Sequence, residues 1–118
     1  MPKVVIGSGS TSPQDWQAYT GAGGPGIFVD VDTSHAHFPE TPVYVCALYG
    51  DSEHWDTVGG SSIYFPSPTS FRVYVRRRPQ VGLTVSDAAR LRWRVGWIGQ
   101  YIHFPFPEGP DPEQPIPS

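Results

Sequence analysis

Side chains suited to ligand binding are concentrated in one short segment, residues 50–56. Five of its residues are able to contact a ligand: Asp51, Glu53, His54, Trp55 and Asp56. Carboxylates accept hydrogen bonds from hydroxyl groups, imidazole donates them, and an indole face stacks on the apolar side of a sugar ring. We therefore predict a carbohydrate site in this segment. A second interpretation is that Trp55 folds back to cap the core while the acids face water, because a lone tryptophan in a short loop commonly belongs to the core.

Basic residues cluster later in the chain. Residues 1–60 hold one base, Lys3, against seven acids, whereas residues 71–94 hold seven arginines against one acid, Asp87. We expect Arg78, in the turn after a strand over 69–77, to donate hydrogen bonds at the same site. Because arginine pairs carboxylates in bidentate fashion, an anionic sugar such as a uronic or sialic acid fits better than a neutral one. No aromatic-interleaved motif accompanies the arginines, so a solvated strand face is preferred to a nucleic-acid partner.

The common enzyme motifs are missing from the sequence. It has no Gly-x-Ser-x-Gly, Gly-x-x-x-x-Gly-Lys, His-Glu-x-x-His or Cys-x-x-Cys segment. We predict that the protein is not an enzyme and uses no cofactor. The pairs Asp30/Asp32 and His35/His37 lack the further ligands that calcium or zinc needs, so no metal site is predicted. The single cysteine, Cys46, is expected to be a buried free thiol in an apolar strand.

The composition predicts an all-β fold. Fourteen prolines and thirteen glycines interrupt helices and punctuate turns. We predict one antiparallel β-sandwich of six or seven strands over residues 1–106, with a single helical turn at 84–90 capped by Thr84 or Ser86. A proline-rich tail over 107–118 is expected to be disordered. The predicted core contains Ile27, Val29, Val31, Val43, Val45, Phe71, Val73, Val75, Val95 and Trp97.

The predicted strand over 43–49 is apolar on both faces. We assign its odd-numbered residues to the core and expect Tyr44, Cys46 and Leu48 to form a subunit interface. With no helix to lie on the sheet, another copy of the protein is the expected cover. No apolar run approaches the roughly 18 residues that span a bilayer, so no membrane span is expected. The apolar patch over residues 1–7 is too short for a secretory signal.

Several segments carry a resemblance to a known family. The chain reads Val-Asp-Val-Asp-Thr-Ser at 29–34, Thr-Pro-Val-Tyr-Val at 41–45 and Phe-Arg-Val-Tyr-Val-Arg at 71–76. A Ser-Pro-Thr-Ser turn precedes the last of these, and Trp97-Ile98 follows in a later strand. Over roughly residues 14–100, this order and spacing resembles the H-type lectin family of snail and slime-mould agglutinins, and is closest to uncharacterised relatives with the same three segments. The resemblance implies a β-sandwich, a homotrimer or hexamer, a sugar site near a subunit boundary, and a place outside the cell or on a cell or virion surface.

The family's sugar-binding residues do not carry over to this chain. The positions of its arginine, tryptophan, histidine and tyrosine hold Ser62, Arg78, Pro79 and Leu91. The resemblance thus implies the scaffold and not N-acetylgalactosamine specificity. We predict a non-enzymatic carbohydrate-binding module that acts multivalently as a homotrimer or hexamer. The alternative is a trimeric structural or adhesion module of a fibre, phage tail or shell, without a sugar ligand.

Overall fold

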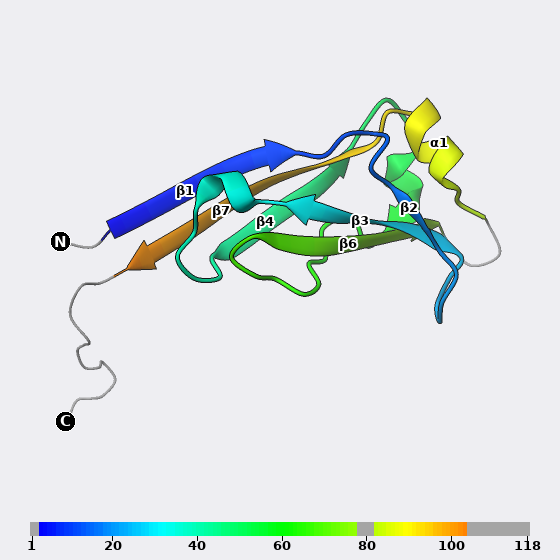
Figure 1. Cartoon of the computed structure of the whole chain (residues 1–118). Coiled ribbons are helices and arrows are strands. Elements are labelled where there is room, and N and C mark those ends of the chain that lie inside the picture. Colours follow the sequence, from blue (N-terminus) through cyan, green and yellow to red (C-terminus); the bar gives the residue numbers. More distant parts are fainter. Residues whose placement is uncertain (1–2, 78–81, 104–118) are drawn as a thin grey trace, which may run out of the picture.

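Two antiparallel sheets face each other in the computed structural model, which describes residues 3–77 and 82–103 (Figure 1). Sheet A has the strand order β1 (Lys3–Ser10), β7 (Arg94–His103), β4 (Val43–Tyr49). Sheet B has the order β2 (Gln17–Tyr19), β3 (Gly26–Asp32), β6 (Ser70–Arg77), β5 (Thr57–Val58). Seven described strands confirm the predicted all-β sandwich. The predicted tail over 107–118 lies outside the described residues.

Alternating apolar and polar residues decide which face of sheet B is buried. The core side chains of β3 and β6 are those predicted: Ile27, Val29, Val31, Phe71, Val73 and Val75. Val29 pairs with Val73 across the two strands, so the apolar residues share one face. The residues between them, including Asp30 and Arg72, point outward, because successive side chains of a strand alternate between faces.

The orientation of β4 is opposite to the prediction. Tyr44 and Cys46 are 8% and 5% exposed and belong to the core, and Leu48 packs against it. Val43 and Val45 are 73% and 62% exposed on the outer face. The predicted core positions of Val43 and Val45 are therefore wrong, and so is the predicted subunit interface of Tyr44, Cys46 and Leu48.

The reason for this orientation lies in the neighbouring strand. Both faces of β4 are apolar, so alternation within β4 does not distinguish them. Cys46 pairs with Trp97 and Leu48 with Val95 on β7. Paired residues of an antiparallel ladder point to the same face, and Trp97 and Val95 are buried. Cys46 and Leu48 must therefore point inward with them.

Tyr44 connects the two sheets through both its ring and its hydroxyl group. Its ring centroid lies 4.7 Å from that of Phe71 and 6.0 Å from that of Trp97. Its hydroxyl donates to the Ser67 carbonyl oxygen at 2.6 Å and lies 2.7 Å from Thr33 Oγ1. Since Tyr44 has one hydroxyl proton, Thr33 is the donor in the second bond. Burial raises the pKa of Tyr44, so the group stays a neutral donor.

Tryptophans and one short helix close an end of the sandwich. Trp93 is fully buried, accepts a hydrogen bond from Trp16 Nε1 at its carbonyl oxygen and donates from its own ring to the Ser52 carbonyl at 2.8 Å. Helix α1 (Val85–Arg90) lies at the same end (Figure 1) and is capped by Thr84, as predicted. The Thr84 backbone N–H donates to the Asp87 carboxylate and holds the pKa of Asp87 below its usual value. Helix α1 is the one α-helix among the described residues.

We expect Tyr44→Phe to lower the free energy of unfolding by about 1–3 kcal/mol, because the Ser67 carbonyl loses its donor and the buried Thr33 hydroxyl keeps only a 3.5 Å contact with the Pro68 carbonyl. Tyr49→Phe is the matched control. The hydroxyl of Tyr49 bonds to Ser10 at the surface, so its loss should cost less than about 0.5 kcal/mol. Urea unfolding of both variants measures the difference, and equal costs would contradict the role assigned to Tyr44.

Candidate functional site

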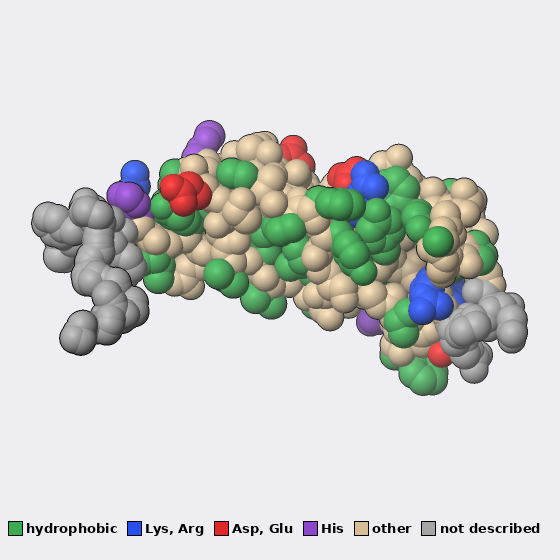
Figure 2. All heavy atoms as spheres, turned by 90° about the horizontal axis from the view of Figure 1, so that it is seen from below, with side chains coloured by type: hydrophobic (Ala, Val, Ile, Leu, Met, Phe, Trp, Pro, Cys, Tyr) green, Lys and Arg blue, Asp and Glu red, His purple; other side chains and the backbone are tan. Residues whose placement is uncertain are grey.

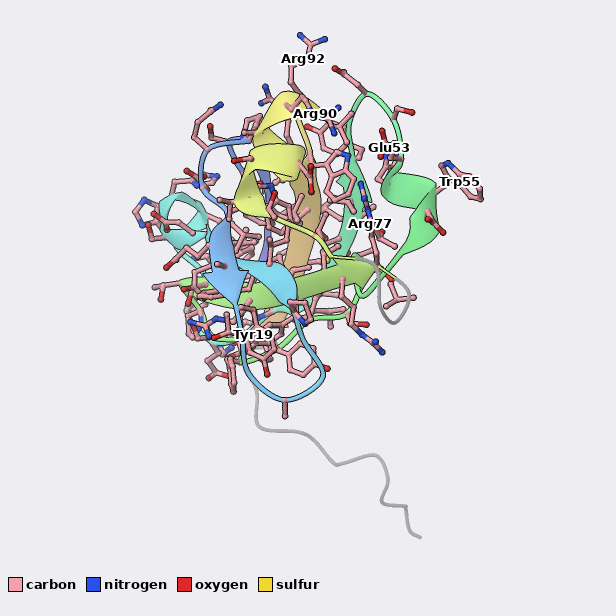
Figure 3. All side chains as sticks on the ribbon, turned by 90° about the vertical axis from the view of Figure 1, so that its right-hand side faces the viewer. Tyr19, Glu53, Trp55, Arg77, Arg90 and Arg92 are labelled. Carbon is pink, nitrogen blue, oxygen red and sulfur yellow. The ribbon has the colours of Figure 1, made fainter. Side chains whose placement is uncertain are left out.

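The predicted binding segment forms a loop at one end of the sandwich, between β4 and β5. Trp55 is 85% exposed and points away from the body of the protein (Figure 3). The interpretation in which Trp55 caps the core is therefore wrong, and Trp93 fills the core at this end. We call residues 50–56 the Trp55 loop.

Two ion pairs brace the Trp55 loop. Glu53 Oε1 lies 2.9 Å from Arg77 Nη2, and these side chains point toward one another in Figure 3. Asp51 Oδ2 lies 2.9 Å from Arg92 Nε, and this hydrogen bond raises the pKa of Arg92. Two predicted hydrogen-bond acceptors are thus already paired within the chain.

The remaining predicted residues of the loop have different environments. His54 and Asp56 belong to a 3-10 helix over His54–Asp56 and are half-buried. Arg78, the predicted donor, lies outside the described residues. The five predicted residues thus lie on one loop, from which the side chain of Trp55 projects into solvent.

A second candidate site lies on the outer face of sheet B, where hydrophobic side chains gather beside basic and acidic ones (Figure 2). Here a hollow of about 460 Å³ opens between the strands and the loops that follow β2 and β5. We call it the aromatic hollow. The side chains that line it include Tyr19, Val58, Ser62, Tyr64, Phe65, Tyr74 and Arg76.

Three tyrosine rings shape the aromatic hollow. The ring centroid of Tyr74 lies 5.1 Å from that of Tyr19 and 5.0 Å from that of Tyr64. The planes of the Tyr19 and Tyr64 rings make angles of 68° and 87° with the plane of the Tyr74 ring. Edge-to-face contacts of this kind hold aromatic rings in place. Phe65, 67% exposed, extends the aromatic surface beyond Tyr64.

The backbone around the hollow is closely packed. Gly59 has a φ of 100°, and a Cβ atom there would overlap the Tyr74 carbonyl oxygen. Glycine is thus required where β5 ends against β6. The Tyr19 hydroxyl donates to the Ala22 carbonyl at 2.8 Å and ties the glycine-rich loop after β2 to the rim. These contacts fix the loops after β2 and β5 against sheet B.

Arg72 supports the floor of the hollow. Its guanidinium group donates to both carboxylate oxygens of Asp30, at 2.6 and 3.0 Å, and to the Tyr74 hydroxyl at 3.2 Å. It also lies 4.3 Å from the ring centroid of Phe28, a cation–π contact. These hydrogen bonds raise the pKa of Arg72. Asp30 offsets the charge of Arg72, and among the described residues that line the hollow the exposed Arg76 is the cation available to an anionic ligand.

Sequence analysis did not identify the aromatic hollow. Tyr19, Tyr64 and Tyr74 come from three segments that meet only in the folded chain. The available signal was the outward face of β3 and β6, where alternation places Phe28, Arg72 and Tyr74 on the surface. A contiguous group of apolar side chains on the solvent side of a sheet is a feature of binding surfaces.

The described residues offer little for metal or nucleophilic chemistry. Among them, no group of three or more His, Cys, Asp or Glu side chains is placed to hold a metal ion. Burial raises the pKa of the Cys46 thiol and so disfavours the reactive thiolate. Within the same ranges, no helix is long and apolar enough to cross a membrane.

Comparison with known proteins returns no relative: no protein-family model, curated protein or solved structure matches this chain significantly.

We expect Glu53→Ala to lower the free energy of unfolding by about 1–3 kcal/mol, because the mostly buried Arg77 loses its carboxylate partner. Arg77 Nε already has no hydrogen-bond partner among the described residues. The control is Asp51→Ala, which breaks a pair with the exposed Arg92 and should cost less than about 0.5 kcal/mol. Thermal or urea unfolding compares the variants. A larger cost for Asp51→Ala would contradict this account of the loop.

Proposed function

We propose that the protein is a non-enzymatic carbohydrate-binding module and that the aromatic hollow holds the sugar. The observation that carries the proposal is the cluster of edge-to-face rings of Tyr19, Tyr64 and Tyr74 around an open hollow of about 460 Å³. This volume falls within the range of roughly 300–1,000 Å³ that small-molecule sites occupy. Tyrosine rings offer apolar faces to the C–H side of a sugar and hydroxyl groups to its polar edge.

An anionic sugar is the favoured ligand class. Arg76 lies exposed at the rim of the hollow, next to the aromatic surface. A guanidinium group binds a carboxylate through two parallel hydrogen bonds, which a neutral sugar does not offer. A uronic or sialic acid would place its ring on the tyrosines and its carboxylate on Arg76.

The resemblance to H-type lectins in segments 29–34, 41–45 and 71–76 supports the same class of function. It also supports a homotrimer or hexamer, in which several weak sites engage one glycan-bearing surface together and gain avidity. The Trp55 loop, where the sequence predicts the sugar site, is the other position we propose for the sugar, because Trp55 presents an exposed indole face beside carboxylates.

A structural or adhesion module without a ligand is the second candidate function. It is favoured by the exposed aliphatic side chains of sheet A, among them Val43 and Val45, which suit assembly more than sugar binding. Glycan binding separates the two candidates.

We expect the unmodified protein to bind anionic glycans on an array that carries neutral and anionic structures. In titrations of the strongest hit, Tyr64→Ala should weaken binding at least about tenfold, since it removes one aromatic wall. Arg76→Gln should reduce the affinity for the anionic glycan and leave that for a neutral analogue unchanged. Tyr64 is 47% exposed, so its removal should leave the fold intact.

Trp55→Ala is the matched control, because it removes a more exposed aromatic side chain from a different surface. If the hollow holds the sugar, this variant binds like the unmodified protein. Loss of binding in Trp55→Ala alone would move the site to the Trp55 loop. Failure of the unmodified protein to bind any glycan would favour the structural module.

A further inference from the structure

The outer face of sheet A is apolar along most of its length. Six exposed aliphatic side chains stand on it: Val4, Ile6, Val43, Val45, Ile98 and Ile102. The strand register places Val4 beside Ile102 and Val45 beside Ile98, so they form adjoining rows. Among the outward positions of these three strands, Arg94 at one end carries the one charge.

The size of this face exceeds what isolated side chains would explain. Three strands of about eight residues, at roughly 3.3 Å per residue and about 4.8 Å between strands, have a flat footprint on the order of 400 Å². Two such faces in contact, with their side chains interleaved, would bury on the order of 1,000 Å² in total, the lower limit of a specific interface. A patch of this size is comparable to the largest apolar patch on a typical monomer, roughly 300–600 Å², and such patches are often binding surfaces.

We propose that a second copy of this chain covers the outer face of sheet A, sheet against sheet. A flat three-stranded surface fits another flat sheet, and sheets stack face to face about 10 Å apart in protein cores. One arginine at the margin gives a nucleic acid or an acidic partner little to bind. Helix α1 lies at the end of the sandwich and leaves this face open (Figure 1).

The outer face of sheet A has a hollow at one edge and projecting side chains at the other, so two copies related by a two-fold axis would fit together. A shallow hollow of about 540 Å³ lies over β4 and β7, beside Val43, Val45 and Ile98. Val4 and Ile6 stand on β1, at the other edge of the sheet. Ile6 and Val43 both pair with Gln100 of the central strand, so they lie at the same level along it. A two-fold axis along β7 would place β1 of each copy over β4 of its partner, with Val4 and Ile6 filling the hollow.

This interface does not depend on sugar binding. The aromatic hollow lies on the outer face of sheet B, on the opposite side of the sandwich, so association through sheet A leaves it accessible. Mass in solution is measured without any glycan, and its outcome is therefore separate from that of the proposed function.

Sedimentation equilibrium of the unmodified chain at roughly 100 µM tests the proposal, since even a micromolar interface is mostly assembled there. We expect a mass that is an even multiple of 13.0 kDa, because a two-fold contact joins copies in pairs. Val45→Arg should shift the mass to that of one chain, because it places a charge in the centre of the buried face. Val58→Arg is the matched control: Val58 is 50% exposed on β5 of sheet B, so this variant should keep the parent mass.

Circular dichroism checks that each variant is folded. Should Val45→Arg fail to fold, Ile6→Lys on the edge strand β1 serves in its place and should also yield the single-chain mass. A single-chain mass for the unmodified protein overturns the proposal. So does an unchanged mass for a folded Val45→Arg, or an equal loss of assembly in Val58→Arg.

Discussion

Tyr44 makes the contact that joins the two sheets. Its ring packs against Phe71 and Trp97 in the core, and its hydroxyl bonds to Thr33 and to the carbonyl of Ser67. With Tyr44 inside, strand alternation turns Val43 and Val45 to the outer face of sheet A. The bond to the Ser67 carbonyl links β4 to the turn before β6, and so joins sheet A to sheet B. One buried side chain thus fixes the contact between the two sheets, and the outward faces of both sheets lie on either side of it.

The sequence predicts the fold well where one face of a strand is polar. In β3 and β6, acids and arginines alternate with valines, so only one orientation buries the apolar set. In β4 both faces are apolar, and local pattern carries no information about which one is buried. The decision comes from β7, where Trp97 and Val95 point inward and take Cys46 and Leu48 with them. The pairing of β4 with β7 joins segments about fifty residues apart in the chain. The local sequence pattern of β4 does not contain this tertiary contact, and the prediction for β4 failed for that reason.

The two candidate sites also differ in how far the sequence predicts them. The Trp55 loop is one continuous segment, so sequence analysis found its residues, and it left open whether Trp55 is exposed. The aromatic hollow combines rings from β2, from the loop after β5 and from β6, and no local pattern joins them. The ion pairs of Glu53 and Asp51 were equally hidden, because their partners Arg77 and Arg92 lie far along the chain.

The two outer faces suggest a division of roles within the sandwich. Sheet A offers an aliphatic surface with one arginine at its end, and sheet B offers aromatic rings with an arginine at the rim of a hollow. Association through sheet A would turn the hollows of several copies outward, away from the contact. Such a layout suits a module that binds a repeated ligand weakly at each site and strongly as an assembly.

The most direct test of this account is hydroxyl-radical footprinting of the unmodified protein in solution, read residue by residue by mass spectrometry. The account predicts rapid oxidation of Tyr64, Phe65 and Trp55, which face solvent on sheet B and in the Trp55 loop. It predicts protection of Val43, Val45 and Ile98, although each is about half or more exposed in the single chain. Oxidation of these three at the rate expected from their exposure in one chain would show that sheet A is uncovered and would contradict the account.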